Sequence, residues 1–318
     1  MMLKRTGLVH IPAEVVKQII ERTEGVPLFI EEYSNLITES GALREVNGRV
    51  QLAEGFDLQA IPATLQDLLV SRLDRLQSVH DVAQMGATIG RRFTYELLRA
   101  VSPLDEATLQ AELEKLIGAE IIFQEGSPPR ATYTFKHALI QDAAYGSLLK
   151  KKRTEFHQRI GDVLEQQFPE TATQEPALLA HHFTEAGLSD KAIQYWLKAG
   201  QKSQAGNAVR EALQQFSRGL ELVLALPPSP ERDGLELQYQ MPLGAMLVQT
   251  KGYAADESGA AFARAREICE QLGQQQMLAF VLAGIWAWHL VRAEHSNALR
   301  LATDLKEPDT NGFHVRFV

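Results

Sequence analysis

The sequence predicts a mainly α-helical protein with one β-hairpin: an N-terminal helical segment, a winged helix and a TPR-like α-solenoid. Three observations lead to this fold class. Apolar residues recur at the spacing of one helix face through most of the 318 residues. Two short β-prone runs flank a Gly/Pro turn between Glu120 and Lys136. From Lys150 onward, only short breaks interrupt the helical pattern. We therefore place the three segments at residues 1–77, 78–149 and 150–318.

The overall composition indicates a globular protein of a reducing compartment. Hydrophobic residues make up 45% of the chain, which is enough for ordinary cores. A formal net charge of −8 argues against a dedicated nucleic-acid binder, which usually carries a basic surplus. The single cysteine, Cys269, cannot form an internal disulfide. We find no apolar run of about 18 residues and no secretory signal, and we expect a cytoplasmic protein without a membrane span.

The first segment predicts helices around one turn-rich interruption. Pro12 begins a helix, and Pro27 begins the next one directly after a Gly-containing joint. The Asn47-Gly48 dipeptide predicts a turn between two short extended pieces. Pro62 begins a third helix. The predicted buried face of this third helix carries Leu65, Leu68, Leu69, Leu73 and Leu76.

The second segment combines helices with the β-hairpin. Three helical patterns cover residues 79–89, 94–101 and 105–118. The two β-prone runs, 120–124 and 132–136, then enclose the turn, and a further helix follows over 138–149. Three helices followed by a hairpin is the order of a winged helix.

The third segment predicts helical repeats. Breaks are expected at Phe168-Pro169, at 187–189, at 227–230 and at Gly273. Small and aromatic residues follow the helix-pair pattern of tetratricopeptide repeats, with the small residues allowing close approach and Phe183 and Trp196 filling the space between pairs. These residues are Ala180, Phe183, Ala192, Trp196 and Ala199. Ala212, Phe216 and Gly219 repeat the end of the pattern at a shorter interval, which predicts a degenerate α-solenoid.

Motifs that carry chemistry are missing from the sequence. It contains no phosphate-binding loop, no nucleophile-elbow serine, no H-E-x-x-H and no C-x-x-C. His181 and His182 are adjacent, so on a helix they point about 100° apart. We interpret them as two partly exposed histidines of a repeat face and not as metal ligands. The basic run Lys150–Arg153 is interpreted as a solvated helix face.

Several stretches resemble a known family, the STAND-class bacterial signalling ATPases. The most similar subgroup is the predicted ATPases often preceded by a class III adenylate or guanylate cyclase domain. The resemblance covers most of the chain from Ile11 to about Leu305, and its central motif, around His137, is quite specific. The stretches are Glu24–Glu32 (EGVPLFIEE), Ile61–Leu68 (IPATLQDL), Thr132–Tyr145 (TYTFKHALIQDAAY), Leu179–Leu188 (LAHHFTEAGL) and Thr250–Ala255 (TKGYAA).

The resemblance implies that residues 1–77 are the helical lid of such an ATPase. In the family, the phosphate loop and the magnesium-binding acidic strand precede the lid, so we expect this chain to be a truncated piece of a longer parent. We also expect an irregular tail from Glu307 onward, where the helical period is lost. The chain by itself is then not an enzyme, whereas the parent is an ATPase that binds ATP or ADP with Mg.

Two site residues follow from the resemblance. Pro27 matches the lid proline that packs near the adenine ring. His137 matches the winged-helix histidine that reaches the nucleotide β-phosphate in the closed, ADP-bound state. From the residues alone, a helix-start proline is the favoured interpretation of Pro27 and a helix-capping histidine that of His137; the flanking motif reverses the preference for His137. The resemblance assigns no catalytic residue and no metal ligand to this chain.

The function that we expect is that of a regulatory and protein-interaction segment of a nucleotide-switched signalling ATPase. Its expected partners are a protein bound by the repeats and the missing upstream nucleotide-binding core. The alternative is a winged-helix DNA-binding transcriptional regulator with TPR-like sensor repeats. The acidic character of the predicted helix 105–118 argues against that alternative. An intact nucleotide cyclase would need a strand-rich domain with a pair of metal-binding aspartates, which the sequence lacks.

The missing phosphate loop leads to a first prediction. The purified chain, assayed with magnesium nucleotide, should hydrolyse neither ATP nor GTP and should form no cyclic nucleotide. Turnover that a point mutation within this chain abolishes would contradict the prediction.

Overall fold

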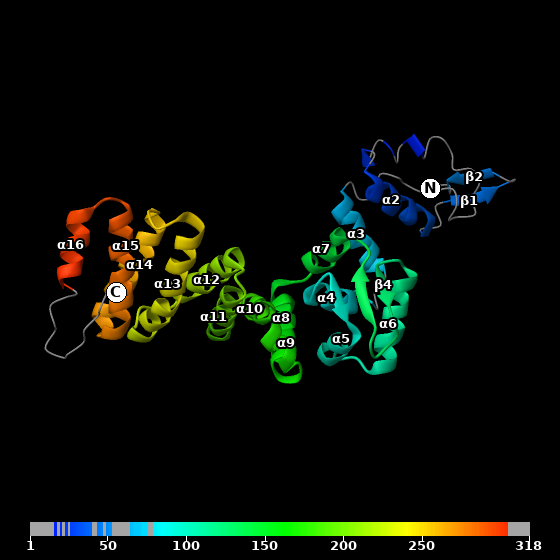
Figure 1. Cartoon of the computed structure of the whole chain (residues 1–318). Helices are drawn as coiled ribbons and strands as arrows, with labels where there is room; N and C mark the ends of the chain where they lie inside the picture. Colours follow the sequence, from blue (N-terminus) through cyan, green and yellow to red (C-terminus); the bar gives the residue numbers. More distant parts are fainter. Residues whose placement is uncertain are drawn as a thin grey trace. The chain divides into compact units, whose positions relative to one another are not determined.

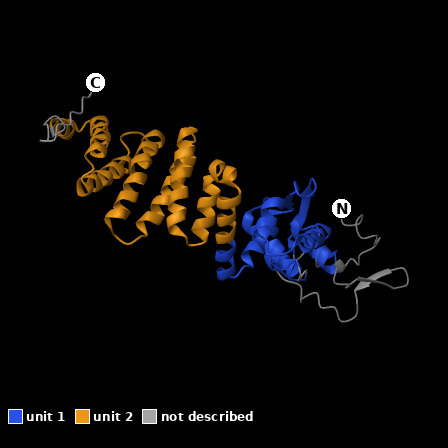
Figure 2. Ribbon diagram, turned by 90° about the horizontal axis from the view of Figure 1, so that it is seen from below, with its two compact units in different colours: residues 1–156 blue, residues 157–318 orange. Residues whose placement is uncertain are grey.

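The computed structural model describes residues 16–17, 20, 23–24, 26–39, 43–46, 49–52, 64–75 and 79–304. The protein is mainly helical, as the sequence predicts, and the described residues form two small antiparallel sheets, one of two strands and one of three. It forms two compact units, Met1–Phe156 and His157–Val318 (Figure 2). No helix in the described ranges is long and apolar enough to cross a membrane.

The N-terminal unit begins with two helices and a hairpin. Helix α2 (Pro27–Glu39) starts at the predicted proline, and α3 (Leu65–Arg75) packs on it. Strands β1 (Leu43–Val46) and β2 (Arg49–Leu52) pair antiparallel on either side of the predicted turn dipeptide. The buried side chains of α2 and α3 are apolar for the most part: Phe29, Tyr33, Leu36, Ile37, Leu68, Leu69 and Leu73. The predicted helix starts at Pro12 and Pro62, and Leu76, lie outside the described residues.

The rest of this unit has the order of a winged helix, as Figure 1 shows in cyan and green. Its elements are α4 (His80–Ile89), β3 (Arg92–Thr94), α5 (Tyr95–Val101), α6 (Glu106–Gly118), β4 (Ile122–Glu125), β5 (Thr132–Phe135) and α7 (Ala138–Gly146). Thr94 and Asp105 cap α5 and α6 by accepting hydrogen bonds from backbone N–H groups. Strand β5 lies between β3 and β4. The sequence did not predict β3, because a three-residue strand is too short to show an alternating pattern.

The second unit consists of helices stacked in sequence order. The unit begins within α8 (Lys150–Gln167) and continues with α9 (Pro169–Gln174), α10 (Pro176–Glu185), α11 (Ser189–Ala205), α12 (Val209–Leu224), α13 (Pro230–Lys251), α14 (Asp256–Leu272), α15 (Gln275–Val291) and α16 (His295–Asp304). From α10 onward each helix packs on the next (Figure 1). All four predicted breaks are confirmed, and the structure adds breaks after α9, α11, α13 and α15. The predicted irregular tail, residues 307–318, lies outside the described residues.

Aromatic rings pressed against glycines hold these helices together. A Cβ on Gly200 of α11 would lie 2.4 Å from the Phe216 ring of α12, and one on Gly219 of α12 would lie 2.2 Å from the Tyr239 ring of α13. Because real Cβ atoms do not approach rings this closely, only glycine allows the helices to pack at this distance. The same arrangement recurs at Gly161 with Phe183, at Gly244 and Gly284 with Phe262, and at Gly259 with Trp288.

The predicted packing residues of the first repeat are buried, with one exception. Ala180, Phe183, Ala192 and Ala199 are buried. Trp196 is only partly buried, and its indole N–H donates a hydrogen bond of 3.0 Å to the Thr184 hydroxyl. Trp196 nevertheless packs against the apolar cluster formed by α11, α12 and α13, so its predicted packing between helices is confirmed although its burial is partial. The adjacent Tyr195 is the buried aromatic residue of that turn.

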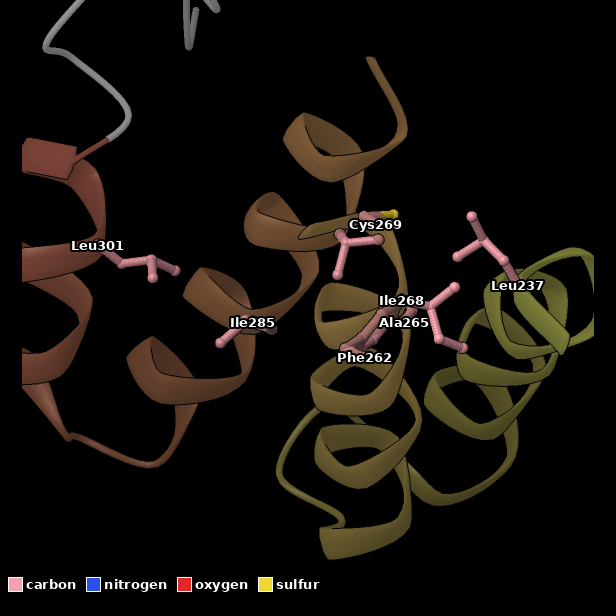
Figure 3. Packing of buried hydrophobic residues seen from close by; sticks show 8 residues of the cluster. Leu237, Phe262, Ala265, Ile268, Cys269, Ile285 and Leu301 are labelled. Carbon is pink, nitrogen blue, oxygen red and sulfur yellow. The ribbon is translucent and has the colours of Figure 1, made fainter. Parts of the chain in front are cut away.

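A second apolar cluster joins the last four helices, as Figure 3 shows. Leu237 of α13 and Ile285 of α15 lie on opposite sides of α14, and Leu301 of α16 lies beyond Ile285. The residues of α14 in this cluster are Phe262, Ala265, Ile268 and Cys269. Cys269 is a buried free thiol, and burial raises its pKa.

Two glycines of neighbouring helices give a matched test of this packing. Gly219→Ala should destabilise the second unit by about 1–3 kcal/mol, because the new methyl group overlaps the Tyr239 ring. Gly234→Ala, in α13, should stabilise it by about 0.5–1 kcal/mol, because a Cβ there meets nothing within 4 Å and alanine favours the helix. Urea unfolding followed by tryptophan fluorescence measures both. Shifts of the same sign would show that ring contact does not decide the difference.

Candidate functional site

The two candidate site residues each stand at the start of a helix. Pro27 is the first residue of α2 and is exposed. His137 is the N-cap residue of α7, with extended backbone (φ −134°, ψ 145°), and it is half-buried. It follows directly on β5, so it lies at the strand-to-helix junction that the sequence predicted.

Lys136 connects the elements that carry these two residues. Its Nζ lies 2.7 Å from a carboxylate oxygen of Glu31 in α2 and 2.7 Å from one of Glu120, which follows α6. Burial disfavours the charged ammonium, but the hydrogen bonds with Glu120 and Glu31 outweigh it and raise the pKa of Lys136. Glu31 lies one turn after Pro27, and Lys136 directly precedes His137. The structure thus ties the helix begun by Pro27 to the junction that holds His137.

A buried ion pair reinforces this connection. Arg72 of α3 donates hydrogen bonds to the Glu32 carboxylate of α2 and to the backbone carbonyl of Ala119, the C-cap residue of α6. The side chain of Arg72 is 6% exposed and that of Glu32 is fully buried. Burial raises the pKa of Glu32 and the guanidinium of Arg72 opposes that rise, so the pair keeps its charge only while both partners stay in place.

The surroundings of both helix starts combine polar and apolar groups. The Nε2 atom of His137 is buried and has no hydrogen-bond partner among the described residues. The backbone N–H groups of a first helical turn have no partner within the helix, so an anion is favourable there. Two large apolar side chains beside the candidate residues are exposed: Val26, next to Pro27, is 45% exposed, and Leu139, in the first turn of α7, is 46% exposed. Each helix start therefore has an exposed apolar side chain beside it, and the start of α7 also favours an anion.

The basic run at the start of α8 differs from its predicted role. Lys150 and Lys151 are exposed, as expected of a solvated face. Lys152 and Arg153 are half-buried instead. Lys152 forms an ion pair with Asp81 of α4 at 2.5 Å, and the guanidinium of Arg153 lies 4.4 Å from the Tyr145 ring centroid. Half of this run therefore anchors α8 to the winged helix and is not available to a phosphate backbone.

The burial of His182 contradicts the prediction that this residue lies partly exposed on a repeat face. Only His181 is exposed; the His182 residue is 1% exposed. Its Nδ1 lies 2.9 Å from the Nδ1 of His157 in α8, which is equally buried. The sequence could not show this pairing, because His157 comes from a helix two elements earlier. No group of side chains in the described ranges has the arrangement of a metal site.

The comparisons with known proteins give one relative by sequence. No family model matches the chain. An uncharacterized protein of Rhizobium meliloti (strain 1021) is 27% identical over 288 residues, which is 89% of this chain. The chain spans 27% of the length of that relative. The crystal structure of BtubC (BKLC) from P. vanneervenii matches 80% of this chain and 98% of its own, at 11% identity and a TM-score of 0.28. At that score the likeness does not indicate a shared fold.

The buried ion pair leads to a prediction about the stability of the N-terminal unit. Arg72→Met should destabilise it by about 3–5 kcal/mol, because Glu32 is then buried without its partner. Adding Glu32→Leu to that variant should recover most of the loss, because no unpaired charge remains. Thermal unfolding followed by circular dichroism measures both variants. A double variant less stable than Arg72→Met would show that the pair does not act through its charge.

Proposed function

We propose that this chain is the lid, winged-helix and repeat segment of a nucleotide-switched signalling ATPase of the STAND class. In this role it regulates the parent and binds a protein partner, and it does not catalyse a reaction alone. The observation that carries the proposal is the Lys136 bridge, which ties the helix begun by Pro27 to the junction that holds His137. The sequence motifs around both residues are those that led to the family resemblance.

The residues present fit a nucleotide at this place. The exposed ring of Pro27 offers a rigid apolar contact with no N–H to satisfy, which suits a purine ring. The imidazole of His137, at the start of α7, can donate to a phosphate oxygen. ATP or ADP with Mg, held by a core outside this chain, would supply the negative charge to which that helix start responds. The role of the chain is then to make contacts that differ between two nucleotide states.

The exposed apolar side chains support a missing neighbour at this surface. Val26 and Leu139 lie within two residues of Pro27 and His137, and neither is needed by the core of the unit. Exposed apolar residues gathered beside polar ones are typical of an interaction site. The upstream nucleotide-binding core is the partner that we propose for them.

The repeats provide a separate surface for a protein partner. Exposed apolar side chains gather on the last two helices of the described chain. They are Phe280, Leu290 and Val291 of α15 and Leu299 of α16. Stacked helix pairs commonly bind proteins through such extended faces. We propose that this part of the solenoid contacts a protein.

The charges of α6 favour this function over DNA binding. In a winged helix that binds DNA, the third helix would meet the phosphate backbone. Here Glu112 is buried and paired with Lys115, and Asp105 caps the helix. Glu106 and Glu114 remain exposed, so the open face carries more negative than positive charge. Phosphates would be repelled by such a helix.

The test of the proposed function is nucleotide release from a full-length parent that contains a phosphate loop. His137→Ala should weaken ADP retention about ten- to a hundredfold, because one charge-assisted hydrogen bond of the closed state is lost. His181→Asn, an exposed change in the other unit, is the control and should leave ADP release unchanged. Equal release rates from the parent and a folded His137→Ala variant would mean that His137 is only a helix cap.

A further inference from the structure

The repeat unit contains a buried pair of imidazoles where α8 packs against α10. His157 of α8 and His182 of α10 are each 1% exposed, and their Nδ1 atoms lie 2.9 Å apart. At that distance one nitrogen must donate and the other accept, so a single proton lies between the two atoms. A further proton would turn one of these buried imidazoles into a charged imidazolium, and on the accepting Nδ1 it would also set two N–H donors against each other.

The surroundings of His182 offer no compensation for a positive charge on its ring. The ring of His181 lies 5.6 Å from that of His182, centroid to centroid, and adds a third titratable imidazole. The buried Nε2 of His182 has no hydrogen-bond partner among the described residues. On α8, the carboxylates of Asp162 and Glu165 face Lys191 of α11, with which they form ion pairs. Tyr195 of α11 donates to Glu165 as well, and Lys198 lies over the Tyr195 ring.

The packing beside the pair is too tight to relax. A Cβ on Gly161, one turn after His157, would lie 2.7 Å from the ring of Phe183, the residue after His182. Helices α8 and α10 therefore cannot shift slightly to admit water around the imidazoles without breaking this contact. Because a buried imidazolium is unfavourable, either the pair stays neutral or its protonation opens the contact between α8 and α10.

We propose that the His157–His182 pair makes the docking of α8 on the first repeat acid-labile, so that protonation of the pair releases the helix. The position of the pair on α8 determines what its protonation would do. Helix α8 spans Lys150–Gln167 and contains the boundary between the two compact units, at Phe156 and His157. Acid would thus loosen the helix through which the chain passes from one unit to the other. This inference does not depend on the proposed nucleotide switch.

The direction of the pH effect follows from proton linkage. Burial, with smaller contributions from His157 and His181, lowers the pKa of His182 from its ordinary 6.5 to about 3. Below pH 6.5 the unfolded chain binds a proton that the folded chain refuses, so stability is full above that pH and falls as the pH drops toward 3. For one such proton, the folding equilibrium constant should fall about 25-fold between pH 7 and pH 5.

The three tryptophans allow a direct test with the full chain. Trp196, Trp286 and Trp288 all lie in the repeat unit, so urea unfolding followed by tryptophan fluorescence reports on that unit. His182→Asn keeps an amide that can bond to His157 but does not titrate. The wild type should lose about 25-fold more in folding equilibrium constant than His182→Asn between pH 7 and pH 5. His181→Asn, at the exposed neighbour, should behave like the wild type.

Equal pH dependence of the wild type and His182→Asn would overturn the proposal. If His182→Asn does not fold, hydrogen exchange of the wild type replaces it. After correction for intrinsic exchange rates, the backbone amides of α8 and α10 should lose protection from hydrogen exchange at pH 5 relative to those of α14. Equal protection of all three helices would overturn the proposal. Zinc chloride and a chelator provide a further check. A large shift of the wild-type unfolding midpoint by zinc at pH 7 would assign the histidines to a metal instead.

Discussion

Arg72 joins three elements of the N-terminal unit from inside its core, and the candidate site depends on that junction. Its guanidinium holds the carboxylate of Glu32 on α2 and the carbonyl of Ala119 at the end of α6. Glu31, the neighbour of Glu32, then faces outward and meets Lys136. The position of His137 therefore follows from a chain of contacts that begins at a buried charge. Without Arg72, a buried carboxylate would stay unpaired, and α2 would lose the anchor that sets Glu31 beside Lys136.

The repeat unit is held by a different kind of constraint. Glycines at Gly200, Gly219 and Gly259 allow an aromatic ring of the next helix to rest against the backbone. The fit is steric, and each contact involves neighbours in the stack, which is typical of a repeat architecture. The charged contact between Arg264 and Glu236, by contrast, links α13 to α14 at one place. Shape, more than charge, fixes the order of the helices here.

Local signals in the sequence were enough to predict most helices, whereas contacts between distant residues were not. Pro27, Thr94 and Asp105 mark helix starts by backbone chemistry that acts within a few residues, so the starts could be read in advance. Strand β3 was missed because it is defined by pairing with β5, some forty residues later. The burial of His182 was missed for the same reason, since its partner belongs to another helix. For the candidate site, the sequence placed His137 at a helix start but could not reveal the Lys136 bridge to Glu31.

The contrast between the two units bears on where a reversible switch could operate. Where an aromatic ring rests against a glycine of the neighbouring helix, the two helices can separate only if the packed core opens. Opening the core is unfavourable because it exposes apolar area to water. The ionic link of Lys136, whose side chain is 11% exposed, with the 36%-exposed Glu31 and Glu120 can open without separating a packed apolar core. A site that must form and release contacts with a nucleotide is therefore consistent with the N-terminal unit, where such links border both helix starts. The repeat unit, held by these ring contacts, suits a surface that keeps its shape for a partner, and its buried His157–His182 pair lies where α8 enters the stack.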